Sequence, residues 1–237
     1  MVEGRFPLRQ YLGGSDHSAV FVTDRGQGLD RAAIKLTSAS PDQRTKQLRR
    51  WEVAKKLTHP NLIRIFHTGN CQLDGSELLY AVMEYADESL SQILPERPLT
   101  PAETGDLLLP VLEALTYIHS QGLVHGHLKP ANILASGDQL KLASDGLHAT
   151  GEAHTDVLPT IYMPPEIVSG GPWSPASDVW SLGVTLVEAL TQRPPVISGT
   201  GDLTVPGTMP APNLKHTTSP WNKDSAPGPI GAFPASF

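Results

Sequence analysis

The most restrictive feature of this 237-residue chain is a polar loop followed by two short apolar segments joined by a turn. The loop and the first apolar segment read His125-Gly126-His127-Leu128-Lys129-Pro130-Ala131-Asn132-Ile133-Leu134. After the turn the chain reads Leu140-Lys141-Leu142-Ala143-Ser144-Asp145-Gly146-Leu147. Because an imidazole titrates near neutral pH, His127 can in principle accept a proton. This stretch is therefore a candidate functional site.

These two segments resemble the catalytic loop and the metal-binding turn of the eukaryotic-type protein kinases, which read HRDLKPxNIL and KLxDFGL. Two positions that carry the chemistry differ, because His127 stands at the catalytic aspartate and Ser144 at the aspartate that holds magnesium. The resemblance makes His127 and Lys129 the catalytic candidates, in a degenerate form. For His127 a hydrogen-bonded structural role is favoured over a catalytic one.

The N-terminal third resembles the nucleotide-binding strands of the same family. Residues 11–23 predict two strands joined by a turn, and Leu12 to Val20 stands in place of LGxGxFGxV, with Gly13 and Val20 retained. Ala32-Ala33-Ile34-Lys35 is similar to the VAIK strand, whose lysine contacts the α- and β-phosphates. An ordinary hairpin turn and an exposed strand lysine are the simpler alternatives for these two segments.

A buried strand over residues 78–86 resembles the kinase hinge that contacts adenine through main-chain groups. The resemblance gives the following cofactor-binding candidates: Gly13, Val20, Ala33, Lys35, Met83, Glu84, Ala86, Asn132 and Leu134.

A helix is predicted from Ser40 toward Leu57, with a capping serine, a proline in the first turn and Gln43. The family places there a glutamate that pairs with the strand lysine, and Arg50 occupies that position. Glu52 is displaced by roughly 200° around the helix, so either the following turn is shorter and Glu52 pairs with Lys35, or this pair is absent. The many basic residues favour a solvated face, and a docking surface for an acidic partner is the alternative.

Three later segments complete the resemblance. Thr100-Pro101-Ala102-Glu103 predicts the start of a core helix with apolar residues at helical spacing, namely Leu108, Val111, Leu112, Leu115 and Ile118. Tyr162 to Glu166 resembles the YMAPE segment. Ser177 to Val184 is similar to a long helix that is apolar nearly all round, which is typical of a helix enclosed by protein; the resemblance implies that its Asp178 anchors the catalytic loop.

The resemblance implies an α+β, bilobal protein-kinase-like fold. It has a small β-rich N-lobe with one regulatory helix, and a mainly helical C-lobe that lacks its last helices. The expected boundaries are residues 6–83 for the N-lobe, 84–88 for the hinge, 89–198 for the partial C-lobe and 199–237 for a tail. The tail is rich in proline and glycine, which predicts disorder and forbids long helices.

Composition excludes several functions. The net charge of −6 provides no basic excess for nucleic-acid binding. Cys71 is the only cysteine, so an intrachain disulfide is excluded and a cytoplasmic location is the simplest. No segment is apolar enough to predict a membrane span.

The substitutions favour a pseudokinase. A serine hydroxyl is a poor ligand for magnesium, and we expect that Asn132 alone does not retain the ion, so no metal site is predicted. Asp145 should face away from the phosphates, because neighbouring side chains in extended backbone point to opposite sides. The expected function is an interaction or allosteric module with a protein partner and weak, metal-independent ATP binding.

Two alternatives are open. One is an active, atypical serine/threonine kinase that uses Lys35, His127, Lys129 and Asn132 together with magnesium. The other is a structural fragment that binds no ligand.

Overall fold

The computed structural model describes residues 1–25, 30–153, 159–197 and 203–204. The chain forms two compact units. The first contains Met1–Arg49 and Ile65–Tyr85; the second contains Arg50–Arg64 and the described residues from Ala86 onward. Helix α1 (Pro41–Ala54) begins in the first unit and ends in the second.

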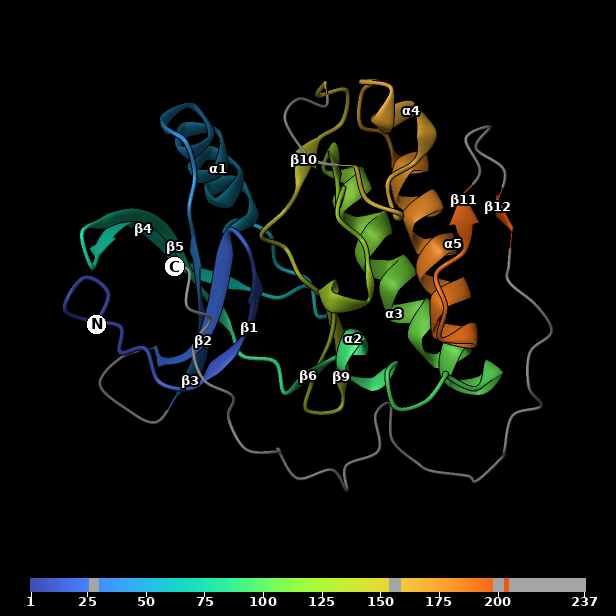
Figure 1. The fold of residues 1–237 in the computed structure, drawn as a ribbon, viewed down its shortest axis with the longest axis horizontal. Helices are drawn as coiled ribbons and strands as arrows, with labels where there is room; N and C mark the ends of the chain where they lie inside the picture. Colours follow the sequence, from blue (N-terminus) through green and yellow to red (C-terminus); the bar gives the residue numbers. More distant parts are fainter. Residues whose placement is uncertain (26–29, 154–158, 198–202, 205–237) are drawn as a thin grey trace. The chain divides into compact units, whose positions relative to one another are not determined.

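The first unit is built on a five-stranded sheet in the order β1-β2-β3-β5-β4, in which every neighbouring pair is antiparallel (Figure 1). The strands are β1 (Tyr11–Ser15), β2 (Ser18–Asp24), β3 (Arg31–Thr37), β4 (Ile65–Leu73) and β5 (Ser76–Glu84). Alternate residues such as Phe21, Ile34 and Val82 join one buried cluster. Because side chains alternate along a strand, this cluster occupies one face of the sheet.

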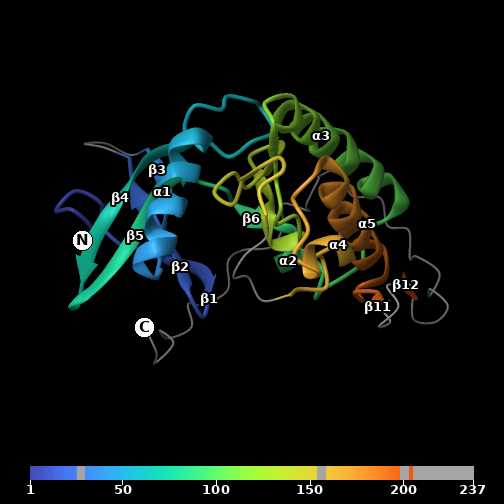
Figure 2. The same cartoon turned by 90° about the horizontal axis from the view of Figure 1, so that it is seen from above.

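The second unit is mainly helical, with α3 and α5 side by side (Figures 1 and 2). Its helices are α2 (Leu90–Ile93), α3 (Pro101–Ser120), α4 (Pro165–Val168) and α5 (Pro175–Thr191), with a 3-10 turn η1 (Pro130–Asn132). Strands β6 (Glu88–Ser89), β8 (Ile133–Ser136) and β9 (Gln139–Leu142) form a small sheet. Two short antiparallel pairs join β7 (Leu123–Val124) to β10 (His148–Ala149), and β11 (Val196–Ile197) to β12 (Leu203–Thr204).

The predicted α+β class is confirmed, and so are both predicted helix starts. The amide of Gln43 bonds to Ser40 Oγ and the Gln43 side chain accepts from the Ser40 amide. Thr100 and Glu103 make the same reciprocal pair at the start of α3. Each pair satisfies amides that the first turn of a helix leaves without intrahelical acceptors.

Two sequence expectations differ from the structure. Helix α1 ends at Ala54 rather than near Leu57, because the amides of Lys56 and Leu57 bond three residues back in a tightened last turn. On α3, the apolar spacing predicts that Leu112 lies in the core, but this residue is 42% exposed. The buried residues of the helix are Leu107, Val111, Ala114, Leu115 and Ile118. Helical spacing predicts how often apolar residues recur along the helix. It does not predict which of two neighbouring apolar residues faces the core.

The expected tail, residues 199–237, lies outside the described residues except for Leu203 and Thr204. Among the helices that are described, none combines the length and the apolar character needed to cross a membrane.

Candidate functional site

The predicted catalytic loop is anchored by one carboxylate. Strand β7 leads into the loop, where the amides of His125 and Gly126 each donate to Asp178 of α5 at 2.8 Å. His119 Nε2 lies 2.7 Å from the same carboxylate. Asp178 is fully buried, so these donors replace the water that the charge has lost. The predicted anchoring role of Asp178 is confirmed.

His125 is buried and held as a neutral imidazole. Its Nε2 lies 2.9 Å from the carbonyl oxygen of Ala143, to which it donates, and its Nδ1 accepts from the amide of His127 at 3.3 Å. Accepting at Nδ1 requires that this nitrogen carry no proton. Burial lowers the pKa of His125, and the nearby Asp178 charge opposes this only in part.

His127, the residue at the catalytic position, is packed among aromatic rings. Its ring stacks on His148 with 5.2 Å between centroids and 22° between planes. Trp173 lies against both rings. The centroid of its ring is 6.3 Å from that of His127 and 4.7 Å from that of His148. The His127 Nδ1 is also 3.3 Å from the carbonyl oxygen of Gly146. Through these contacts the His127 ring packs against residues outside the loop and helps to hold the loop in position.

Gly126 precedes His127 and makes this stack possible. Its φ is +71°, in the left-handed region. A Cβ at this position would lie 2.6 Å from Cδ2 of the His148 ring. Only glycine tolerates both the backbone conformation and this close approach.

Ser144, at the metal-binding position, is 2% exposed, and its Oγ donates to the carbonyl oxygen of Ile63 at 2.6 Å. The segment before Ile63 runs beside β9, since the amide of Leu142 donates to Asn61 and the amide of Ile63 donates to Leu142. The hydroxyl therefore uses its proton in a hydrogen bond inside the protein. A buried, neutral oxygen of this kind does not fit the carboxylate-rich ligand set that magnesium prefers.

The side chain of Asn132 is also held by a main-chain contact. Asn132 Nδ2 donates to the carbonyl oxygen of His127 at 2.6 Å, and the half-buried Lys129 precedes the η1 turn. Asp145 is half-buried, and its carbonyl oxygen accepts from the Trp51 indole at 2.9 Å. Across the ranges that the structure describes, no three His, Cys, Asp or Glu side chains gather as metal ligands.

The nucleotide-binding candidates divide between the two units. In the first unit, Val20 on β2 pairs with Lys35 on β3, and Val20 also pairs with Gly13. Ala33 lies two residues before Lys35 and pairs with Met83, so Val20, Ala33 and Lys35 share the sheet face opposite the buried cluster. Glu84 ends β5 in this unit, while Ala86, Asn132 and Leu134 belong to the second.

Basic side chains at two positions of helix α1, and Lys55 directly after its end, engage acidic partners. Arg50 pairs with Glu152 at 2.5 Å, and Lys55 pairs with Glu52 at 2.8 Å. Arg44 pairs with Glu77. These contacts favour the solvated-face interpretation. The two alternatives for Glu52, a pair with Lys35 or no such pair, stay untested.

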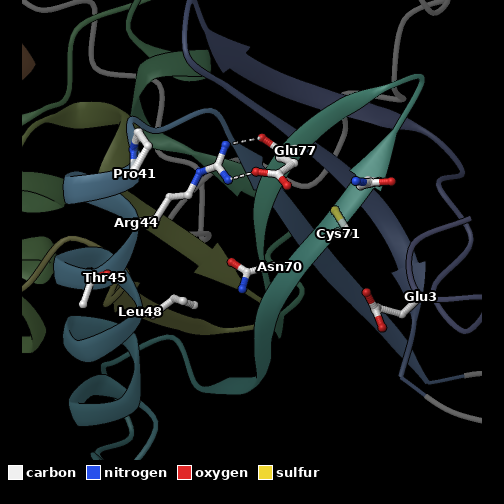
Figure 3. Close-up of a pocket in the computed structure, with 9 residues that line it drawn as sticks. Glu3, Pro41, Arg44, Thr45, Leu48, Asn70, Cys71 and Glu77 are labelled. Atoms are coloured by element: carbon white, nitrogen blue, oxygen red, sulfur yellow. Dashed lines mark hydrogen bonds and ion pairs between the residues drawn. The ribbon is translucent and has the colours of Figure 1, made fainter.

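A pocket of about 470 Å³ lies in the first unit between α1 and the β4–β5 hairpin (Figure 3). Nine residues line it: Glu3, Pro41, Arg44, Thr45, Leu48, Asn70, Cys71, Gln72 and Glu77. Arg44, its cation, donates to the Glu77 side chain, to the Glu77 carbonyl and to the Ala39 carbonyl. The positive charge of the guanidinium is thus already balanced by Glu77, and the pocket does not resemble an anion site.

Several residues of the site carry no local sequence signal. Tertiary contacts alone bring His148 and Trp173 to His127, Ile63 to Ser144, and Glu152 to Arg50. Gly126 had such a signal, since glycine replaces the arginine of the family's HRD motif.

Comparisons with known proteins agree with this geometry. Residues 8–223 match the protein kinase domain family. A probable serine/threonine-protein kinase of Streptomyces coelicolor is 31% identical over 82% of this chain and 31% of its own length. Serine/threonine-protein kinase PknB of Mycobacterium tuberculosis is 32% identical over 84% of this chain and 34% of its own. The chain thus spans about a third of each of these relatives.

A solved structure has the same fold. The crystal structure of a point mutant of the Mycobacterium tuberculosis PknI kinase domain superposes with a TM-score of 0.69 at 26% identity, covering 83% of this chain and 77% of that one.

Proposed function

Because this chain belongs to the protein kinase domain family, in its bacterial serine/threonine type, we propose that it is a pseudokinase. In this role it is a signalling module that recognises a protein partner in the cytoplasm and does not transfer phosphate. The observation that carries the proposal is the buried hydrogen bond from Ser144 to Ile63, because it removes the group at the metal-holding position from use as a ligand.

The packing of His127 supports the same proposal. General-base catalysis requires that the base reach the hydroxyl of the substrate within hydrogen-bond distance. The His127 ring instead stacks on His148, and its Nδ1 lies beside Gly146. Loss of a general base alone lowers a rate by roughly two to four orders of magnitude, and a missing cation site lowers it further.

Weak ATP binding without magnesium is part of this proposal. It is supported by the shared face of Val20, Ala33 and Lys35, which offers two apolar side chains and one cation on adjacent strands. A cation beside the phosphates supplies part of the charge neutralisation for which active kinases rely on metal ions.

A thermal-shift titration with ATP tests the proposal. We expect the same rise in melting temperature in magnesium and in EDTA, because a ligand that binds only the folded state stabilises it by mass action. The Lys35→Ala variant should lose most of that rise. A rise that requires magnesium would contradict the proposal and favour an active kinase, and a flat response at millimolar ATP would favour a fragment that binds no nucleotide.

A further inference from the structure

Helix α3 carries two neighbouring leucines on its solvent side. Leu109 is 64% exposed and Leu112 is 42% exposed. Each of the other helices that the structure describes has at most one exposed large apolar side chain. Eight exposed residues at helical spacing form this side of the helix, which we call the α3 face: Ala102, Gly105, Asp106, Leu109, Leu112, Glu113, Thr116 and Ser120.

The opposite side of α3 fixes the orientation of the helix. The buried residues of the helix lie there, namely Leu107, Val111, Ala114, Leu115 and Ile118. The amide of Thr58 donates to the hydroxyl of Tyr117 at 3.2 Å, and His119 Nε2 lies 2.7 Å from the buried Asp178 carboxylate. Because these contacts hold the helix on its inner side, it cannot rotate to bury the two leucines of the α3 face.

Two carboxylates border the leucines. Asp106 and Glu113 are exposed and seven positions apart, which places them on the same side of the helix and about 10 Å apart along its axis. The third carboxylate of the helix, Glu103, pairs with Arg97 at 2.8 Å. Across the described residues no cation pairs with Asp106 or Glu113, and α3 contains no lysine or arginine. The α3 face is therefore both apolar and negatively charged.

Pro110 adds a further hydrogen-bond acceptor beside this face. It lies inside the helix, and proline has no N–H to donate to the carbonyl oxygen four residues earlier. The carbonyl oxygen of Asp106 therefore lacks the donor that a helix normally supplies, next to the carboxylate of the same residue. Two acceptors at one position favour a partner that brings a charged N–H donor.

The chemistry of the α3 face defines the partner that fits it. Covering Leu109 and Leu112 requires apolar side chains, since burial of apolar area is the main favourable contribution to association. Bringing Asp106 and Glu113 close to that contact requires cations, because a carboxylate that loses water without a partner is costly. An amphipathic helix with basic residues two turns apart, beside an apolar stripe, meets both requirements.

We propose that the α3 face binds a basic amphipathic helix of a partner protein. The apolar side chains of that helix cover Leu109 and Leu112, and its lysines or arginines pair with Asp106 and Glu113. This proposal rests on the proposed function as an interaction module, and it gives the surface and the chemistry by which that module recognises its partner.

A synthetic peptide is the probe. We use a labelled helix of about 18 residues, roughly five turns, in which leucines form one stripe bordered by lysines. Fluorescence anisotropy with the full chain should give a Kd in the micromolar range, and no binding up to about 1 mM would overturn the proposal. A peptide of the same composition, reordered so that no stripe forms, should bind at least roughly tenfold more weakly. Equal binding of the two peptides would indicate charge attraction alone and would also overturn the proposal.

Charge reversal locates the site. The double variant Asp106→Lys with Glu113→Lys should bind the striped peptide roughly tenfold more weakly or worse, because two ion pairs become two repulsions. The matched control reverses two exposed carboxylates elsewhere, Glu96→Lys with Glu166→Lys, and changes the net charge equally. It should keep the affinity within about twofold. Equal losses in the two double variants would overturn the α3 face as the site.

Removal of one leucine tests the apolar part of the contact. Leu109→Ala should weaken peptide binding roughly tenfold, because most of a buried leucine side chain is lost. The variant should fold normally, since the residue is exposed and alanine is the better helix former. Val168→Ala, at a 49% exposed position of α4, is the matched control and should bind as the natural chain does. A folded Leu109→Ala variant with unchanged affinity would contradict the proposal.

Two further outcomes are separable. If the natural chain self-associates without peptide and Asp106→Lys with Glu113→Lys abolishes this, a second copy covers the α3 face and a different partner protein is the wrong occupant. The peptide measurements do not depend on nucleotide. Peptide binding with active phosphate transfer would overturn the pseudokinase alone, whereas an ATP response without peptide binding would overturn the α3 face alone.

Discussion

Ser144 Oγ donates a 2.6 Å hydrogen bond to the carbonyl oxygen of Ile63, and both residues lie in the protein interior. The bond ties the segment after β9 to the chain that follows helix α1. It satisfies a buried carbonyl, which is costly to leave without a donor. A residue placed where the family holds a metal thus serves the cohesion of the fold.

Replacing Ser144 tests that role. Ser144→Ala leaves the Ile63 carbonyl without its donor and should lower the free energy of unfolding by about 1–2 kcal/mol. Ser144→Asp should cost more, roughly 3 kcal/mol or above, because an ionised carboxylate would be buried against a carbonyl oxygen. Urea unfolding of the two variants measures both changes. If Ser144→Asp proves as stable as the natural chain, the side chain at this position is not confined as described.

Gly126 offers a paired comparison with Gly122. Their φ angles are +71° and +70°, so Gly126→Ala and Gly122→Ala share a backbone strain of about 1 kcal/mol. A Cβ at Gly126 also meets the His148 ring, whereas one at Gly122 meets no atom within 4 Å. We expect Gly126→Ala to cost about 1–3 kcal/mol more than Gly122→Ala in denaturant unfolding. Equal costs would show that His148 does not stack over the loop.

The burial of His125 predicts a pH dependence of stability. Burial lowers the pKa of His125 in the folded state, whereas an unfolded histidine titrates near pH 6.5. The unfolded chain therefore binds more protons at low pH, and this contribution to stability is lost as the pH falls below about 6.5.

The contribution of His125 is measured by comparing unfolding at pH 7.5 and pH 5.5. We expect His125→Gln to reduce the loss of stability between these values, by at most about 1.4 kcal/mol for each pH unit. The same replacement at His17, an exposed histidine of the first unit, is the matched control. An unchanged pH dependence in His125→Gln would show that His125 gains its proton without penalty in the fold.

Local rules predicted much of this fold. The reciprocal bonds of Thr100 with Glu103 depend on residues three apart, so they are visible in the sequence. The family motif that contains Asp178 predicts its contact with the catalytic loop, and Asp178 accepts hydrogen bonds from two loop amides.

Other features depend on contacts between distant segments. The stack of His127, His148 and Trp173 joins three segments that no local period connects. The exposure of Leu112 and of Val179 likewise depends on which neighbour covers each helix. Apolar spacing predicts that a face will be buried, but not which surface buries it.

The central claim is that this kinase fold does not transfer phosphate. Incubation with γ-labelled ATP, in magnesium and then in manganese, tests it most directly with a general acceptor protein and with the chain itself as acceptors. We predict no labelling above that of the Lys35→Ala variant with either cation. Labelling that requires magnesium and is lost in Lys35→Ala would contradict the account.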